Sequence, residues 1–152
     1  IPFLLTACSL QRTVPPEVSV VNVLLENVTV FETVAVFTIR VDNENPFPLE
    51  IDGGVHRFYL NDNYVGKGFD ETGFTIPRLS STTQEVRVHL SNLRFFLKLQ
   101  SLLESSTLSY RIESTLYTNR AFDRDLDVTN SGSLDLAPAP GAWKQLPPNG
   151  QP

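Results

Sequence analysis

The stretch Thr29–Asp52, TVFETVAVFTIRVDNENPFPLEID, decides the fold of this chain. From Phe31 to Val41 every second residue is apolar, apart from one threonine, and the alternate positions become polar from Thr38 onward. Successive side chains of a strand point to opposite faces, so this pattern predicts a long strand with one buried face. Such a strand, followed by a second one, is the core of an all-β domain, and nothing in the stretch is catalytic.

The predicted strand ends at a polar corner, Asn43–Pro48, with the sequence NENPFP. Pro46 and Pro48 have no amide hydrogen to give to a sheet, and Asn45 is pushed into an extended conformation by the proline that follows it. The side chains of Asn43 and Asn45 can hydrogen-bond nearby backbone groups. We therefore expect Asn43, Asn45 and Pro46 to shape the fold rather than to form a binding pocket.

The composition is that of a single globular domain with a negative net charge. The chain has 152 residues, of which 41% are hydrophobic and 19% charged, and it is long enough to bury a core. Its net charge of −5 argues against a nucleic-acid partner, since proteins that bind phosphate backbones carry basic patches. The single cysteine excludes an internal disulfide and a multi-cysteine metal site, and no run of ~18 apolar residues forms a complete transmembrane helix.

The first eight residues, IPFLLTAC, resemble the end of a bacterial lipoprotein signal peptide, with Leu5–Cys8 matching the lipobox. The resemblance implies cleavage before Cys8, which then carries diacylglycerol and a further acyl chain as a stable anchor. We expect residues 1–7 to be the remnant of the signal peptide and residues 8–16 to be a tether. The alternative is a short buried strand with a free thiol, but no partner strand follows the cysteine.

Further strands are predicted on both sides of the central stretch. Glu17–Glu26 is apolar in both phases, which fits a strand covered on two sides or one that carries a bulge. The apolar phase slips across Gly53-Gly54, where glycine would admit a bulge, and Asn61–Asn63 has the residues of a hairpin turn. Other strand-like segments follow at 74–77, 85–90, 108–116 and 126–136.

One segment has helical rather than strand periodicity. After a cap at residues 91–92, five apolar side chains fall within about a 120° arc, those of Phe95, Phe96, Leu99, Leu102 and Leu103. The sequence predicts an amphipathic helix here, packed at one end of the domain. Residues 137–152 contain five of the eleven prolines without periodicity, and they predict an extended tail in which Trp143 is either docked or exposed.

The number and spacing of these elements indicate the fold class. About seven strands, one helix and a turn every ten or so residues are typical of an antiparallel β-sandwich of the immunoglobulin or fibronectin III type. We assign residues 17–136 to this all-β domain.

Several segments in a fixed order together resemble one family. They are Pro16–Val18, Val41–Leu49, Tyr59–Asn61, Val65–Gly68, and Ile76-Pro77 before a Ser/Thr-rich strand. This order resembles the water stress and hypersensitive response (WHy) domain of the type 2 late embryogenesis abundant proteins, in its bacterial lipoprotein form. The resemblance covers roughly Pro16 to Leu136, although Glu44 stands where the family's Asn-Pro-Asn triplet has proline. It implies a β-sandwich with a helix that protects against desiccation, cold or freezing without catalysis.

Residues that could carry other chemistry are sparse. His56 and His89 are the only histidines, and the sequence pairs neither with a nucleophile or an orienting residue. His89 lies on the polar phase of its strand, which favours a solvated side chain. His56 follows the glycine bulge, so the sequence does not decide on which face of the strand it lies. Asp123, Asp125 and Asp127 imitate the start of a calcium loop but lack the glycine and glutamate of an EF-hand, which favours a solvated acidic turn. We expect no catalysis, no metal site and no cofactor.

Two functional classes remain open. The first is a stress-protective lipoprotein that shields partly unfolded client proteins or the membrane by weak contacts. The second is a structural or assembly lipoprotein whose sandwich docks a specific envelope partner, which predicts a contiguous apolar patch beyond a few hundred Å². In both we expect a monomer held in the bacterial cell envelope through the lipid on Cys8. The resemblance, with Ser9 after the cysteine, implies the outer membrane, facing the periplasm.

Overall fold

The computed structural model describes residues 13–26, 29, 33–90, 107–118 and 125–135, which form eight β-strands where about seven were expected. The strands are β1 (Glu17–Glu26), β2 (Thr33–Asn43), β3 (Leu49–Leu60), β4 (Asn63–Asp70), β5 (Phe74–Ile76), β6 (Ser80–Leu90), β7 (Thr107–Thr118) and β8 (Leu126–Asp135). The described part of the chain contains no helix. The predicted helix falls within residues 91–106, which lie outside it.

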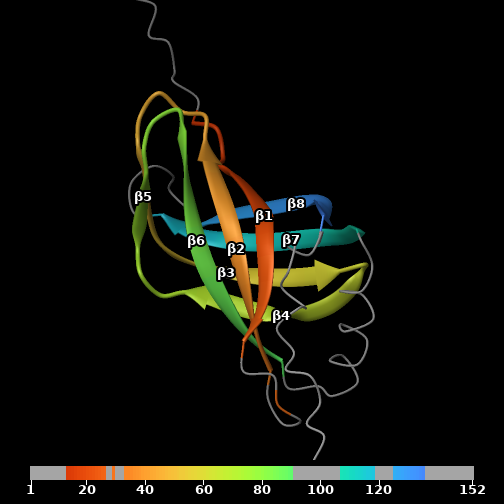
Figure 1. Cartoon of the computed structure of the whole chain (residues 1–152). Coiled ribbons are helices and arrows are strands. Elements are labelled where there is room, and N and C mark those ends of the chain that lie inside the picture. Colours follow the sequence, from red (N-terminus) through yellow and green to blue (C-terminus); the bar gives the residue numbers. More distant parts are fainter. Residues whose placement is uncertain (1–12, 27–28, 30–32, 91–106, 119–124, 136–152) are drawn as a thin grey trace, which may run out of the picture.

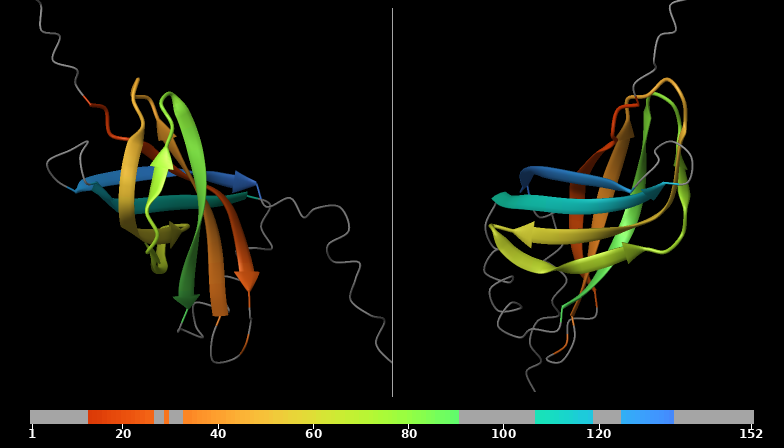
Figure 2. Two further views of the ribbon diagram at one scale, coloured as in Figure 1. Left: turned by 90° about the vertical axis from the view of Figure 1, so that its left-hand side faces the viewer. Right: turned by 180° about the vertical axis from the view of Figure 1, so that it is seen from behind.

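The strands form two antiparallel sheets packed face to face, which confirms the predicted β-sandwich. One sheet has the order β1-β2-β6, and the other has the order β4-β3-β7-β8, with β5 paired to the start of β3. Figures 1 and 2 show that the strands of the two sheets cross at a large angle. Counting β5, a sheet of three strands thus packs on a sheet of five.

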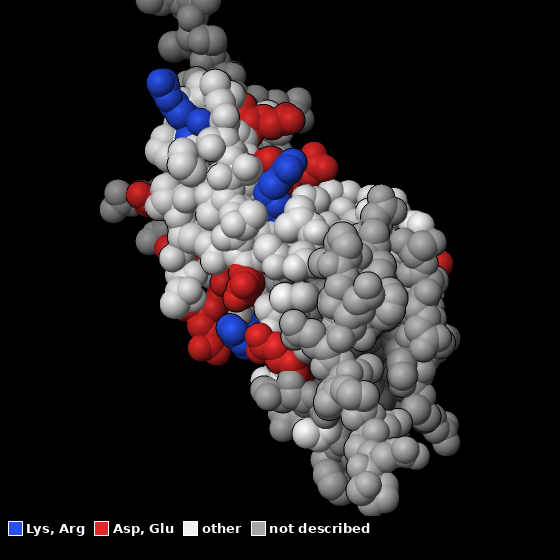
Figure 3. Space-filling view, in the orientation of Figure 1, with Lys and Arg blue, Asp and Glu red and all other residues white. Residues whose placement is uncertain are grey.

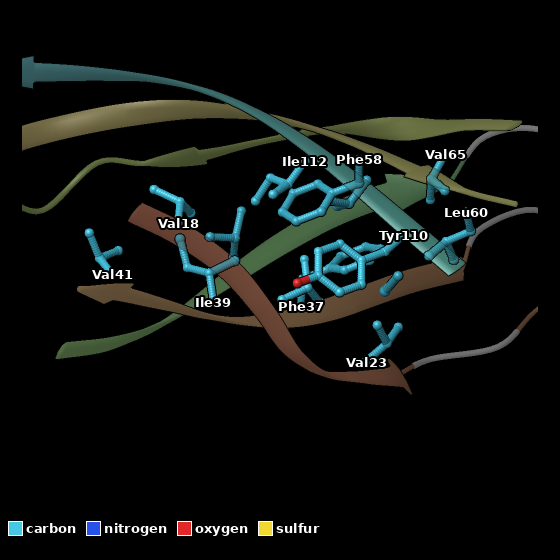
Figure 4. Packing of buried hydrophobic residues seen from close by; sticks show 14 of the residues in the cluster. Val18, Val23, Phe37, Ile39, Val41, Phe58, Leu60, Val65, Tyr110 and Ile112 are labelled. Atoms are coloured by element: carbon cyan, nitrogen blue, oxygen red, sulfur yellow. The ribbon is translucent and has the colours of Figure 1, made fainter. Parts of the chain in front are cut away.

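The core lies between the sheets and is built from the strand phases that the sequence predicts. Phe37 of β2 and Phe58 of β3 stack with their ring centroids 3.9 Å apart, and both rings are buried. Ile39 and Val41 of one sheet and Ile112 of the other belong to the same cluster (Figure 4). Burying a side chain of this size contributes ~1.5–3 kcal/mol, so this layer supplies much of the stability of the fold.

β1 carries the bulge that its two apolar phases allowed. Its register with β2 shifts between Val20 and Asn22, which leaves Val21 without a register partner. The extra residue keeps both Val20 and Val23 buried, while Val21 is 43% exposed. Of the two alternatives for this segment, the bulged strand is therefore confirmed.

A second irregularity bends β3 where the sequence has two glycines. The register of β3 with β7 shifts between Ile51 and Gly53, and the strand turns there from β5 toward β4 (Figure 2). A β-carbon on Gly53 would lie 2.7 Å from the Asp70 carbonyl oxygen, so a side chain would push β4 away. The predicted glycine bulge is confirmed. So is the hairpin turn after β3, where Asn61 and Asp62 have φ of 45° and 62°.

Two glycines of β4 allow it to pack against β6 of the other sheet. A β-carbon on Gly66 would lie 2.5 Å from Val88 Cγ1, and one on Gly68 would lie 2.2 Å from Val86 Cγ1. Protein interiors are close-packed, so neither position has room for a larger side chain unless β6 moves. The pattern Val65–Gly68, VGKG, is therefore a packing requirement of this sandwich.

Candidate functional site

Asn43 holds the polar corner at the end of β2 together. Its side-chain amide donates hydrogen bonds to the Phe47 carbonyl at 2.9 Å and to the carbonyls of Ile76 and Pro77 at 3.3 and 3.2 Å. Its side-chain oxygen accepts from the backbone and the side-chain nitrogen of Asn45, both at 2.9 Å. One buried side chain thus joins the corner to the end of β5.

Asn45 joins the same corner to the segment before β1. The backbone N–H of Val14 donates to Asn45 Oδ1 at 2.8 Å, and Asn45 Nδ2 donates to the Val14 carbonyl at 2.8 Å. The side-chain amide therefore pairs with Val14 as a peptide group of a neighbouring strand would. The backbone carbonyl of Asn45 also accepts from the N–H of Leu79 at 3.1 Å.

The corner presents little to a ligand. Asn43 and Asn45 are 2% and 1% exposed, and their side-chain atoms bond to the protein itself, whereas Pro46 is exposed and makes the bend. An open depression of about 650 Å³ lies beside them, lined by Glu17, Arg40, Asp42, Asn43, Glu44, Leu79, Ser80 and Ser81. Arg40 and Asp42 pair with each other at 3.0 Å. We interpret this depression as a solvated surface hollow.

The second candidate lies inside the sandwich, around His56. The Ser114 hydroxyl is 2.8 Å from His56 Nδ1, and His56 Nε2 faces Asp70 Oδ2 at 4.0 Å. A serine, a histidine and an aspartate in this order are the components of a hydrolase triad. Here, however, Ser114 is 2% exposed and His56 is fully buried, so the hydroxyl cannot meet a substrate. The three residues form a polar cluster in the core.

Burial determines the charge of this cluster. It lowers the pKa of His56 from 6.5 to about 4, because the charged ring would lose its hydration. Burial also raises the pKa of Asp70 for the corresponding reason. His56 is therefore uncharged at neutral pH, and its approach to Asp70 is not an ion pair.

The partners of His56 were not predicted from the sequence, although the phase of the strands indicates part of the arrangement. Counting back in twos from Phe58 places His56 on the inward face of β3, and Ser114 lies in the inward phase of β7 between Ile112 and Leu116. Their contact also requires the register between β3 and β7, which pairs His56 with Ser114 directly. Such long-range registers leave no local signal in a sequence.

Several predicted sites lie outside the described residues: Cys8, Asp123, and Trp143 with the tail. Asp125 is exposed, and Asp127 accepts a hydrogen bond from the Thr115 hydroxyl at 2.7 Å. In the described ranges no three His, Cys, Asp or Glu side chains gather as a metal site would require. Nor does any helix there have the length and apolar character needed to cross a bilayer.

Three solved structures are similar to this chain at low sequence identity, and the likeness to the first supports the fold. The solution structure of AT1g01470 from Arabidopsis thaliana is 18% identical, with 85% of each chain covered and a TM-score of 0.56. A crystal structure of a protein from Archaeoglobus fulgidus is 17% identical, with 77% of this chain and 97% of the other covered and a TM-score of 0.45. A protein described as late embryogenesis abundant, At2g46140.1, is 16% identical, covers 79% of this chain and 70% of its own, and has a TM-score of 0.39.

The sequence itself matches one family model. No curated protein matches the chain in a sequence search. The model LEA_2, whose description is late embryogenesis abundant protein, matches residues 38–132, from the middle of β2 into β8. Such a match fits a stress-related role. Because it spans well over half of the sequence, this chain belongs to the LEA_2 family of late embryogenesis abundant proteins.

Proposed function

We propose that this protein is a non-catalytic, stress-protective lipoprotein of the bacterial cell envelope and that its sandwich is a WHy domain. The observation that carries the proposal is the family match over residues 38–132. The order of the corner, Val65–Gly68 and Ile76-Pro77 resembles the WHy form of that family. A lipid on Cys8 anchors the sandwich at the outer membrane, where it shields client proteins or the membrane.

The described surface supports weak, general contacts rather than one specific docking site. Its large exposed hydrophobic residues come from several elements rather than one, namely the segment before β1, β1, β4, β7 and the β5–β6 turn: Val14, Val21, Leu24, Tyr64, Phe69, Leu79 and Tyr117. On the face of β1, β2 and β6, acidic and basic groups are mixed among uncharged residues (Figure 3). A specific docking surface would instead gather apolar residues into one patch.

The protective mechanism follows from the way in which damaged proteins aggregate. Partly unfolded clients expose hydrophobic segments and associate when they meet. Weak, reversible contacts with the sandwich lower the rate of these encounters, and the net charge of −5 keeps each complex soluble. The proposed mechanism uses no catalysis, and the burial of the Ser114 hydroxyl beside His56 is in keeping with this.

The test is recovery of a labile enzyme's activity after freezing and thawing. The full chain with Cys8→Ser, which removes the acceptor for the lipid, should preserve more activity than albumin at equal mass. The added protein should turn over none of the assay components. Protection no better than that by albumin would contradict the proposal and favour the assembly lipoprotein, for which envelope proteins captured with the native chain would be the next measurement.

A further inference from the structure

The outward face of the β3–β4 hairpin has the opposite charge to the chain as a whole. Burial alternates along β3, where His56 and Phe58 face the core, so the side chains between them face outward. A register shift between Phe58 and Tyr59 keeps the exposed residues of β4 on the same side of the sheet. We call this set the hairpin face: Val55, Arg57, Tyr59, Tyr64, Lys67 and Phe69. It carries two cations and no carboxylate, whereas the net charge of the chain is −5.

The two cations of the hairpin face lie directly opposite each other. Arg57 of β3 is the register partner of Lys67 of β4, and both are exposed. Neither forms an ion pair within the described part of the chain. Glu113, the neighbour of Arg57 on β7, instead pairs with Arg111 and accepts a hydrogen bond from the Tyr59 hydroxyl at 3.2 Å. Like charges directly opposite each other destabilise a sheet, so an anion bound between them would be stabilising.

Aromatic side chains flank the cation pair along the hairpin. Tyr64 and Phe69, on either side of Lys67 in β4, are 51% and 52% exposed. The ring of Tyr59 lies 5.4 Å from that of Tyr64, and the Arg111 guanidinium lies 3.7 Å from the Tyr59 centroid. Cations among exposed aromatic rings are typical of protein surfaces that contact a bilayer, where the cations attract anionic lipids and the rings lie at the level of the headgroups.

We propose that the hairpin face docks on a bilayer that contains anionic phospholipids, with headgroup phosphates at Arg57 and Lys67 and with Tyr64 and Phe69 among the headgroups. This inference rests on the membrane contact of the proposed function and names the surface that makes it. The phosphate is complementary in charge to the cation pair, whereas the negative chain as a whole is repelled by such a bilayer unless this face is turned toward it. Binding of free phosphate would use the two cations but not the exposed rings beside them.

The arginines of the other sheet are already paired with carboxylates. Arg40 of β2 lies 3.0 Å from Asp42, and Arg87 of β6 lies 3.9 Å from both Glu26 and Glu85. An anionic bilayer would have to compete with these carboxylates, so we expect the sheet of β1, β2 and β6 to face away from it. Because both arginines are exposed, they also provide a control that is matched in charge to the cation pair of the hairpin face.

Cosedimentation of the full chain carrying Cys8→Ser with vesicles measures docking without a lipid anchor. At low ionic strength the chain should bind vesicles of phosphatidylglycerol mixed with phosphatidylcholine, and it should not bind vesicles of phosphatidylcholine alone. Arg57→Gln with Lys67→Gln should weaken binding roughly tenfold or more, because each cation near an anionic surface strengthens binding about fivefold. Arg40→Gln with Arg87→Gln changes the net charge equally and should weaken binding by less than about threefold. Urea melts establish that both double variants fold.

The aromatic part of the hairpin face has a separate measurement. Phe69→Ser should weaken vesicle binding by a factor that is independent of salt, whereas the effect of the Arg57 and Lys67 changes should shrink as salt rises. Equal losses in the two double variants would show that net charge alone governs binding, which overturns the proposal. Binding to neither kind of vesicle, or to both equally, would also overturn it, as would NMR shifts at the hairpin face with inorganic phosphate but not with vesicles. The freeze–thaw assay contains no lipid, so protection of an enzyme and docking on a bilayer can fail independently.

Discussion

Asn45 pairs both ends of its side-chain amide with one residue, Val14, which lies 31 positions earlier in the chain. Asn45→Ala removes both bonds and leaves buried polar groups of the corner unpaired. We expect a loss of ~1–3 kcal/mol of stability, measured in urea melts. Glu44→Ala, at the exposed neighbouring position, should change stability by no more than about 0.5 kcal/mol.

The same variant tests whether the corner only shapes the fold. If it does, Asn45→Ala should lose client protection only in proportion to its loss of stability. A variant that melts like the parent but no longer protects would instead make the corner a binding site.

The buried His56 should make stability depend on pH. Its pKa is lowered from 6.5 to about 4 in the folded protein, whereas the unfolded chain takes up the proton near the ordinary value. Stability is therefore lost as the pH falls from 6.5 toward 4, by up to about 3 kcal/mol. Burial raises the pKa of Asp70, so proton uptake by the folded state there offsets part of the loss at the acid end.

Urea melts at a series of pH values between about 4 and 7 measure this dependence. The parent should lose stability with acid, and His56→Asn, whose side chain takes up no proton in this range, should lose less. Equal slopes for His56→Asn and the parent would contradict the assignment of the loss to His56.

At the residue scale, sequence alone could predict where the chain turns but not what the turning residues bind. Two asparagines before prolines indicate a corner, because their local conformation is restricted. The pairing of Asn45 with Val14 depends on two segments that meet only when β1 and β2 have formed. The contact of His56 with Ser114 has the same origin in long-range register.

Among the elements, β4 is a strand whose sequence is constrained by the packing of its neighbour. A β-carbon on Gly68 would meet Val86 Cγ1 of β6 at 2.2 Å. Gly68→Ala should therefore cost about 1–3 kcal/mol through overpacking, measured as a lower midpoint in urea. Adding Val86→Ala removes the clashing methyl group. The double variant should therefore lose less stability than the sum of the losses of the two single variants. Strict additivity would show that the glycine is needed for some reason other than contact with the Val86 side chain.

Element by element, the sequence predicted the strands well because burial alternates along most of them, although the first five residues of β2 are buried on both faces. The alternation of β2 identified Phe37, Ile39 and Val41 as core residues, and glycines marked the bend of β3. For β1, two apolar phases left two alternatives, since a bulge and burial on both faces produce the same pattern of residues. The register shift at Val21 distinguishes them, and it depends on the partner strand.

For the whole molecule, the prediction with the clearest measurement concerns the anchor. Native protein purified from membranes should begin at Cys8 and carry the mass of its acyl chains, because Leu5–Cys8 matches the lipobox. Cys8→Ser should leave the protein in the soluble fraction, since it removes the thiol that accepts the lipid. Mass spectrometry in which an unmodified peptide spanning Phe3–Arg12 dominates would contradict the lipoprotein assignment.

The hydrogen bonds between Asn45 and Val14 also limit the length of the free tether between the lipid on Cys8 and the sandwich. A chain anchored at Cys8 reaches Val14 in six residue steps, which span at most about 20 Å when fully extended. Because Val14 is clamped to the corner, Pro15 and Pro16 add nothing to this reach, although they precede β1. The sandwich would thus stay within a narrow layer next to the lipid headgroups. It would protect proteins that unfold in this layer, and it would not reach proteins deeper in the periplasm.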